Sequence, residues 1–507
     1  MTPFALFLIG FLEIILFFVV RLMPVWPSRR HTCDAYYFLM TAEEFRKNRK
    51  IPIVLPPYYM ADIEEQWYPP GFSIFLGLLP PALLTRYHWM INHVLDFLNM
   101  VLMDGWLWWM TGRVETVLIA NAVYILTPAL TLEYASLTSR SLGNLLFTLL
   151  MICLYPLAVG ANSVFGGWLV SALLAAAIWF LILMTHKMTM QLGLFAAAVL
   201  AVAFRSWAPV AIAFGVVLLS ILVTRGYYWK LLKAHWDIVS FWNKHQLRLT
   251  AHQVYDSEIY RDTAKGFLGR NGKFMQPLRF LLRVLGYNPF IYVAIVVLFT
   301  PVGSSGMPRY FGLWVGAVLA WAIATTLVPY LKALGEGYKY IKYSALPAAA
   351  FIGLTAGDWS DIRLSVLAVF MAIASAAVLV KVIVCRWRSY RNASLAGGNE
   401  ESEIIRYVQE NKHIDRIGCI SNYISDALVY FARRHVLWGT HHYCFNSKVI
   451  DIHPVLSLPI EQISEKYDLK YWLINTAYVD PSVLGFSNKV LEKEAGIYRL
   501  YRVEEAV

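Results

Sequence analysis

The chain has 507 residues, of which 58% are hydrophobic and only 15% are charged. Soluble globular domains carry about 25% charged and about 45–50% apolar residues, so this composition excludes an ordinary soluble protein and predicts a polytopic membrane protein. The formal net charge is +11. Because the basic residues lie in loops beside apolar segments, we exclude a nucleic-acid partner. We expect membrane lipids, or a phosphorylated lipid substrate, to contact them.

The first apolar segment, residues 3–22, has the length of about 20 residues that a helix needs to cross a bilayer. It has no basic region before it and no small-residue cleavage site, so we interpret it as a retained span rather than a signal peptide. Glu13 lies inside this segment. A carboxylate at that depth is costly, and we expect it to face a neighbouring helix.

A polar stretch, residues 33–71, follows the first span. Its first half, residues 34–50, has the pattern of an amphipathic helix that lies at the membrane interface. Prolines at 52, 56 and 57 end this helix. Residues 71–84 are apolar, but a run of about 14 residues favours an interfacial or re-entrant segment over a crossing.

Ten further apolar segments each predict one span, and with the first they give about eleven spans. They are residues 88–110, 114–131, 144–159, 165–185, 192–204, 207–224, 289–302, 310–330, 345–355 and 362–384. The polar segment 225–287 is predicted to form interfacial helices. The transmembrane part therefore comprises residues 1–390.

The composition changes after this part. Residues 391–399 read as a Gly/Ser/Asn-rich linker. Residues 400–507 alternate helical and strand-like runs and predict a small α/β domain with its own core. The expected helices are 403–411, 426–434 and 460–467, and the expected strands are 416–421, 435–439, 470–474 and 496–503.

Asp34 is the first candidate site residue. It directly follows the first span, where a carboxylate can act as a base or orient a nucleophile at the membrane surface. The alternative is a helix N-cap, a position at which Asp is favoured. Both roles are compatible, because a capping carboxylate keeps one oxygen free.

Two polar turns at the ends of spans hold further candidates. In the turn 132–143, Arg140 can bind a phosphate oxygen through two parallel hydrogen bonds, or it can form an ion pair with Glu133. His186 follows the fifth span and is a candidate base or phosphate contact. Its alternative is an interfacial histidine satisfied by hydrogen bonds. Lys187 is a second candidate phosphate ligand.

The loop 331–343 contains Lys339 and Tyr340 beside two glycines, Gly335 and Gly337. The glycines would let the backbone approach a ligand closely. Lys339 offers a point charge to a phosphate. Its alternative role is a basic anchor at the membrane interface.

The order of these motifs resembles the GT-C glycosyltransferase superfamily. Asp34-Ala35-Tyr36-Tyr37 follows the first span, and Trp67-Tyr68-Pro69-Pro70-Gly71 leads back into apolar sequence. The superfamily includes oligosaccharyltransferase catalytic subunits, protein O-mannosyltransferases and aminoarabinose transferases of lipid A. The resemblance covers about residues 1–390 and implies a GT-C-like helical membrane domain.

The resemblance also implies roles for the candidates. Asp34 would be the catalytic carboxylate, and Glu133 the acidic residue of the second external loop. The substrate and the lipid phosphate would contact a set of six residues: Tyr68, Arg140, His186, Lys187, Lys339 and Tyr340. Glu133 has no neighbouring acid, unlike the acidic pair common in the superfamily, so a divalent cation such as Mg²⁺ or Mn²⁺ stays open. Asp34 and Glu133 would be its ligands.

The implied reaction moves a sugar from a polyprenyl-phosphate donor to a lipid, glycan or protein acceptor. The implied location is the external face of a prokaryotic inner or plasma membrane, with the C-terminal domain on the same side. The basic loops oppose this orientation, because Lys and Arg favour the cytoplasmic side. A transporter or flippase of lipid-linked saccharides, and a polymerase or ligase, are the alternatives. The sequence shows no inverted repeat of the kind that many transporters contain.

Overall fold

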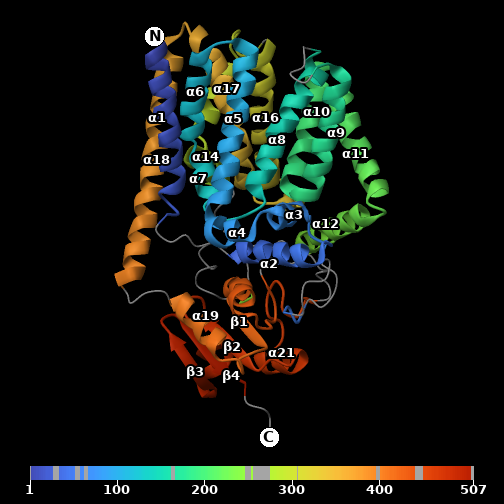
Figure 1. The fold of residues 1–507 in the computed structure, drawn as a ribbon, viewed down its shortest axis with the longest axis vertical. Helices are drawn as coiled ribbons and strands as arrows, with labels where there is room; N and C mark the ends of the chain where they lie inside the picture. The colour runs from blue at the N-terminus through green and yellow to red at the C-terminus, as the bar shows by residue number, and fades with distance from the viewer. Residues whose placement is uncertain are drawn as a thin grey trace. The chain divides into compact units, whose positions relative to one another are not determined.

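The computed structural model describes residues 2–26, 33–51, 58–61, 67–160, 166–245, 253–254, 275–304, 306–395, 400–439 and 449–503. The chain divides into two compact units (Figure 1). Unit 1 comprises residues 1–30, 87–228 and 277–390, and unit 2 comprises residues 31–86, 229–276 and 391–507. Both units are discontinuous in sequence.

Unit 1 contains helices and no strand in its described residues. Its longer helices are α1 (Pro3–Leu22), α5 (Ile91–Thr111), α6 (Val114–Ile125), α8 (Arg140–Val159), α9 (Trp168–Thr185), α10 (Lys187–Phe204), α11 (Ala208–Val223), most of α14 (Met275–Tyr287), α16 (Gly306–Leu327), α17 (Ala345–Thr355) and most of α18 (Ile362–Leu395). Its shorter helices are η1 (His88–Met90), α7 (Pro128–Glu133), α15 (Phe290–Leu298), η3 (Pro329–Leu334), η4 (Gly337–Ser344) and η5 (Ala356–Asp358).

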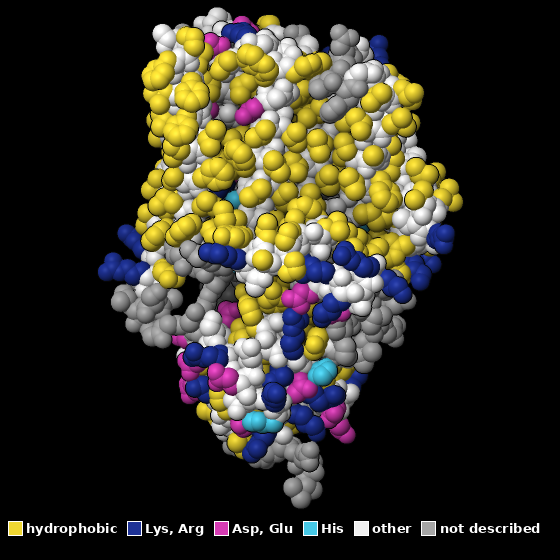
Figure 2. Space-filling model, viewed as in Figure 1, with side chains coloured by type: hydrophobic (Ala, Val, Ile, Leu, Met, Phe, Trp, Pro, Cys, Tyr) yellow, Lys and Arg dark blue, Asp and Glu magenta, His cyan; other side chains and the backbone are white. Residues whose placement is uncertain are grey.

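The apolar helices confirm a polytopic helical membrane protein. Within the described residues, six helices are long and apolar enough to cross a membrane: α1, α8, α9, α10, α16 and α18. Two bent pairs, α11 with α12 (Tyr227–Lys244) and Phe280–Tyr287 with α15, raise the number to eight if each is one broken span. The count of about eleven stays a prediction. Hydrophobic side chains cover the surface of these helices in Figure 2.

The candidate spans of unit 1 differ in how much of each is buried, which distinguishes central helices from helices at the edge. In α8, 78% of the most apolar window is buried inside the protein, whereas α1 and α18 each bury only 17%. The sequence of α8 fits its central place, because both faces carry apolar or small residues. α1 and α18 lie together at one edge of the helical unit in Figure 1, and the Trp387 indole donates to the Met23 carbonyl at 2.9 Å.

Arg21, the penultimate residue of α1, ties that edge helix to the interior. Its guanidinium is fully buried and pairs with Asp96 of α5 at 2.8 Å. It also donates to the carbonyls of Tyr124 and Ile125 and to the Thr131 hydroxyl. A buried charge is tolerated when it is paired and hydrogen-bonded, so this one side chain fixes α1 against α5, α6 and α7.

Unit 2 combines helices with the C-terminal sheet. Its helices are α2 (Cys33–Asn48), α3 (Gly71–Leu78), α4 (Pro81–Tyr87), most of α12 (Tyr227–Lys244), α19 (Glu400–Glu410), η6 (Asn422–Ile424), α20 (Ser425–Ala427), the π-helical turn η7 (Leu428–Ala432), α21 (Ile460–Tyr467), η9 (Pro481–Leu484) and η10 (Phe486–Asn488). Its strands are β1 (Ile417–Ile420), β2 (Tyr471–Asn475), β3 (Val490–Ala495) and β4 (Tyr498–Arg502).

The four strands form one sheet in the order β1-β2-β4-β3. β1 and β2 are parallel, and the β2–β4 and β4–β3 pairs are antiparallel. β3 is absent from the sequence-based prediction. The predicted strand 435–439 forms isolated bridges at Val436, to Tyr59 and Ile417, instead of a full strand. The linker predicted at 391–399 begins inside α18, and its last four residues lie outside the described ones.

The amphipathic helix expected at 34–50 is α2, and it packs on two partners within unit 2. The Arg46 guanidinium donates to the carbonyls of Leu76, Gly77 and Leu79 at the end of α3. On the other side, Glu43 pairs with Arg433 at 2.6 Å. The polar stretch 33–71 is thus joined to the C-terminal α/β fold, which lies far away in sequence.

Candidate functional site

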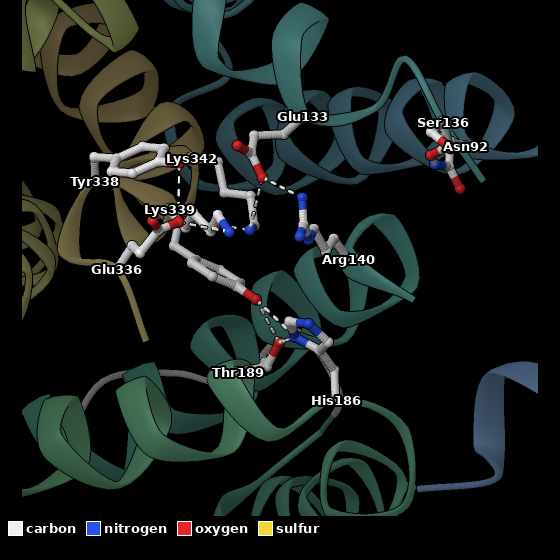
Figure 3. A network of polar contacts seen from close by, with 11 residues as sticks. Asn92, Glu133, Ser136, Arg140, His186, Thr189, Glu336, Tyr338, Lys339 and Lys342 are labelled. Carbon is white, nitrogen blue, oxygen red and sulfur yellow. Dashed lines mark hydrogen bonds and ion pairs between the residues drawn. The ribbon is translucent and has the colours of Figure 1, made fainter. Parts of the chain in front are cut away.

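Glu133 lies at the centre of a network of charged side chains in unit 1 (Figure 3). It ends α7, and Arg140 begins α8 after a short turn. One carboxylate oxygen, Oε2, is 2.8 Å from Arg140 Nη1 and 3.4 Å from Lys342 Nζ. A cation at a helix N-terminus is unfavourable next to the positive end of the helix dipole. The negative charge of Glu133 offsets this unfavourable interaction of Arg140. The ion pair considered from the sequence is therefore confirmed.

Lys342 is the buried cation of this network. Its side chain is 0% exposed, and besides Glu133 its ammonium donates to the Lys339 carbonyl at 3.0 Å. Burial lowers the pKa of Lys342 from its ordinary 10.5 to about 7, although Glu133 opposes this shift. Burial alone would raise the pKa of Glu133, but the charges of Lys342 and Arg140 outweigh it, and that pKa lies below its ordinary value. Glu133 is thus an ionised carboxylate at neutral pH.

Lys339 belongs to the exposed end of the same network. Its ammonium is 2.6 Å from Glu336 Oε2, and the Tyr338 hydroxyl donates to the same oxygen at 2.9 Å. The Arg283 guanidinium lies over the Tyr338 ring, 5.0 Å from its centroid. The side chains of Lys339 and Arg140 remain 31% and 24% exposed, in contrast to Lys342. These two cations are therefore the ones that a ligand can reach.

The two glycines of the loop have different roles. Gly335 adopts a φ of +140°, a conformation that side chains disfavour. Gly337 packs against α16 so closely that a Cβ would overlap the Ala322 carbonyl and the Thr326 hydroxyl. Gly337 therefore serves the packing of η4, the segment that carries Lys339 and Lys342. This is a different reason from the ligand approach expected from the sequence.

His186 belongs to a second, buried cluster. Its Nδ1 is 3.0 Å from Thr189 Oγ1 and 3.1 Å from the Tyr343 hydroxyl, and these two hydroxyls are 2.7 Å apart. The ring is only 5% exposed. Tyr340 is fully buried, and its hydroxyl is 2.6 Å from Gln191 Oε1. Both residues connect η4 to α10, whose first residue is the half-buried Lys187.

Asp34 and Tyr68 belong to unit 2. Asp34 lies in the first turn of α2 and is half-buried. A carboxylate in that turn is favoured by the helix dipole. The Tyr68 ring packs edge-on against Tyr37 and Phe38 of the same helix, with centroids 6.1 and 5.8 Å away. Tyr68 thus supports the helix that carries Asp34.

The divalent cation expected at Asp34 and Glu133 stays a prediction. Such an ion takes about six oxygen ligands, but the described residues contain no group of three or more His, Cys, Asp or Glu side chains that could hold one. The Glu133 carboxylate is already engaged by Arg140 and Lys342. We therefore derive no chemical step through a metal.

Lys342 and Glu336 lie in the loop that the sequence pointed to, but they were not predicted as site residues, and Tyr343 was not singled out at all. The signal for Lys342 is its place three residues after Lys339, which is one turn of a 3₁₀ helix. Nothing in the local sequence indicates that Lys342 is buried while Lys339 is exposed. That difference arises from how η4 packs against α16.

No protein-family model matches the sequence, and no curated protein matches it. Solved structures are similar to it in fold. ArnT from Cupriavidus metallidurans bound to undecaprenyl phosphate has a TM-score of 0.58 at 9% identity and covers 99% of this chain and 98% of its own. The Archaeoglobus fulgidus oligosaccharyltransferase AglB in complex with an inhibitory peptide and a dolichol-phosphate has a TM-score of 0.53 at 12% identity. It covers 93% of this chain and 69% of its own.

A further structure of the A. fulgidus oligosaccharyltransferase, in complex with Zn and sulfate, has a TM-score of 0.54 at 13% identity. It covers 92% of this chain and 68% of its own. At these identities the similarity concerns the fold. It confirms the GT-C-like fold that the motifs in the sequence indicated.

Proposed function

We propose that the chain is a membrane glycosyltransferase of the GT-C type. It transfers a sugar from a polyprenyl-phosphate donor to a lipid, glycan or protein acceptor. The observation that carries this proposal is the pair of reachable cations, Arg140 and Lys339, linked through Glu133 and the buried Lys342. Neighbours of the same fold hold dolichol-phosphate or undecaprenyl phosphate.

The phosphate leaving group determines which charges the reaction needs. When the bond from the sugar to the phosphate breaks, the phosphate takes the electron pair and gains negative charge. Fixed cations at that point lower the barrier by electrostatic stabilisation. Arg140 offers a planar fork to the phosphate and Lys339 a point charge. Lys187 is a third candidate at the start of α10.

Asp34 acts as the base in this proposal. The acceptor hydroxyl or amine attacks the anomeric carbon, its proton passes to the Asp34 carboxylate, and the polyprenyl phosphate leaves. General-base catalysis of this kind contributes about 10²–10⁴-fold. Tyr68 positions α2. We assign His186 and Tyr340 to the positioning of η4, because both are buried and bonded within unit 1. The proposal places the reaction at the external membrane face of a prokaryotic cell.

The experiment uses the full chain in lipid nanodiscs with undecaprenyl-phosphate-linked sugars and a membrane lipid extract as acceptor. Release of undecaprenyl phosphate measures transfer. Asp34→Asn should lower transfer by at least about 100-fold and leave binding of undecaprenyl phosphate unchanged. Glu44→Gln, a carboxylate on the same helix, is the matched control and should keep full activity. Full transfer by the Asp34→Asn variant would remove Asp34 from the mechanism, and movement of the donor across the bilayer without phosphate release would favour a transporter.

A further inference from the structure

Three polar side chains meet inside the helices of unit 1, apart from the charged network described above. They are Glu13 of α1, Asp104 of α5 and Asn121 of α6. The Asn121 amide nitrogen Nδ2 is 3.4 Å from Asp104 Oδ2, and both Asn121 and Asp104 interact with the Glu13 carboxyl. Glu13 and Asn121 are only 9% and 6% exposed. The apolar residues around Glu13 on α1, including Phe11 and Ile14, face outward as expected for a lipid-facing helix.

The oxygens of this cluster lack hydrogen-bond donors. Glu13 Oε2, Asp104 Oδ1 and Asn121 Oδ1 are all buried, and each has no hydrogen-bond partner among the described residues. Carboxylate oxygens and amide oxygens accept hydrogen bonds and do not donate them. Among the described side chains of this cluster, the donor is the amide nitrogen of Asn121, which donates to Asp104. Buried polar groups are normally satisfied. The cluster therefore has more hydrogen-bond acceptors than donors.

Basic side chains do not supply the missing donors. In the described part of the chain, no basic side chain forms an ion pair with Glu13 or Asp104. Arg21 of α1 is paired with Asp96 of α5, and Glu115 at the start of α6 is exposed. The helix α17, which packs on α6, contains no charged residue. An ionised carboxylate at membrane depth without a partner is costly, and protonation is the usual way to neutralise it.

We propose that Glu13, Asp104 and Asn121 form a proton-binding site within the membrane-spanning helices. At neutral pH at least one of the two carboxyls is protonated. A carboxyl O–H supplies the missing donor and can bond to the Asn121 oxygen or to the other carboxyl. A metal cation fits less well, because it takes about six oxygens and the described residues offer three unpartnered oxygens here. The bound proton joins α1 to α5 and α6 and removes at least one buried charge.

The test exploits the chemistry of a protonated carboxyl in an apolar setting. Dicyclohexylcarbodiimide adds to such a group. The acid proton moves to a carbodiimide nitrogen, the acyl group transfers from oxygen to nitrogen, and the resulting N-acylurea is heavier by one carbodiimide with nothing lost. The full chain in lipid nanodiscs is treated at neutral pH, and the modified residue is located by peptide mass spectrometry.

The proposal predicts modification of Glu13 or Asp104 that decreases as the pH rises. Asp96 is the internal control, because it is buried on the same helix as Asp104 but is paired with Arg21, and it should stay unmodified. Infrared spectroscopy gives an independent readout: a carboxylic C=O band that Glu13→Gln or Asp104→Asn weakens and the double variant removes. Both substitutions imitate the protonated form, so these variants should fold.

Three results would overturn the proposal. The first is the absence of both the modification and the infrared band. The second is protection of the carboxyls by sodium chloride but not by choline chloride at constant pH, which would show a metal cation in the site. The third is unfolding of the Glu13→Gln and Asp104→Asn variants, because it would show that the negative charge itself is needed.

Discussion

Removing the charge of Glu133 should destabilise the protein far more than removing that of Lys342. Glu133→Gln leaves Lys342, whose side chain is fully buried, without its carboxylate partner. Breaking a buried ion pair from one side costs about 3–5 kcal/mol. In Lys342→Met, by contrast, Glu133 keeps its contact of 2.8 Å with Arg140, and no unpaired charge is left behind. The double variant should regain most of the stability that Glu133→Gln loses.

The magnitude follows from the burial of the two partners. An exposed ion pair contributes only about 0.2–1 kcal/mol, and Glu336–Lys339 belongs to that class because its side chains are 34% and 31% exposed. Glu336→Gln is therefore the matched control, and we expect it to change stability by less than about 1 kcal/mol. Glu133 and Lys342 are only 7% and 0% exposed, so the larger value applies to them.

The pH dependence of Glu133→Gln provides a second check. The folded-state pKa of Lys342 lies at about 7, below the ordinary 10.5 of the unfolded chain. Between these values the unfolded state binds more protons, so this group makes the folded state more stable as the pH rises. Without Glu133, burial acts on Lys342 unopposed and lowers its folded-state pKa further, so the folded variant loses this proton at a lower pH than the native protein does. The part of the Glu133→Gln stability deficit that Lys342 causes should therefore shrink as the pH rises toward 7 and stay constant above about 7, where Lys342 is neutral in both folded proteins.

The assay is unfolding of the detergent-purified full chain, followed by tryptophan fluorescence at several pH values. Equal losses of unfolding free energy in Glu133→Gln and Glu336→Gln would refute the reasoning, because they would show that the buried Glu133–Lys342 pair contributes no more than an exposed ion pair. A deficit that does not depend on pH would show that Lys342 is not the origin of the loss.

Two further predictions concern the packing around the network and the edge helix. Gly337→Ala forces η4 away from α16 and should lower both thermal stability and binding of undecaprenyl phosphate, while Gly316→Ala on α16, where a Cβ meets open space, should change neither. Arg21→Met leaves Asp96 buried without its partner and should cost about 3–5 kcal/mol in the same unfolding assay. Arg21→Met with Asp96→Leu should recover part of it, and a single variant as stable as the native chain would contradict the role of Arg21.

Several helix bounds could be predicted from the sequence because each helix is a continuous apolar run. The segments 345–355 and 207–224, predicted as spans, match the helices α17 and α11 within about a residue, and their crossing of the membrane stays a prediction. β3 was missed because its sequence, Val490–Ala495, is exposed at half of its residues and carries three charged residues. An edge strand is often charged in this way, and its pattern resembles a loop.

The candidate site could be predicted only in part. The pairing of Glu133 with Arg140 follows from their closeness in sequence, since one short turn separates them. The burial of Lys342 depends on η4 packing against α16 through Gly337, a contact between segments that local patterns do not encode. The Arg21–Asp96 pair joins residues 75 positions apart, and an arginine at the end of a span looks like an ordinary interfacial anchor.

The most direct test of the proposed function is a structure of the full chain with undecaprenyl phosphate bound. The account predicts phosphate oxygens within hydrogen-bond distance of Arg140 and Lys339, with Lys342 still buried against Glu133. A phosphate bound elsewhere, while Arg140 and Lys339 keep their contacts with Glu133 and Glu336, would contradict it.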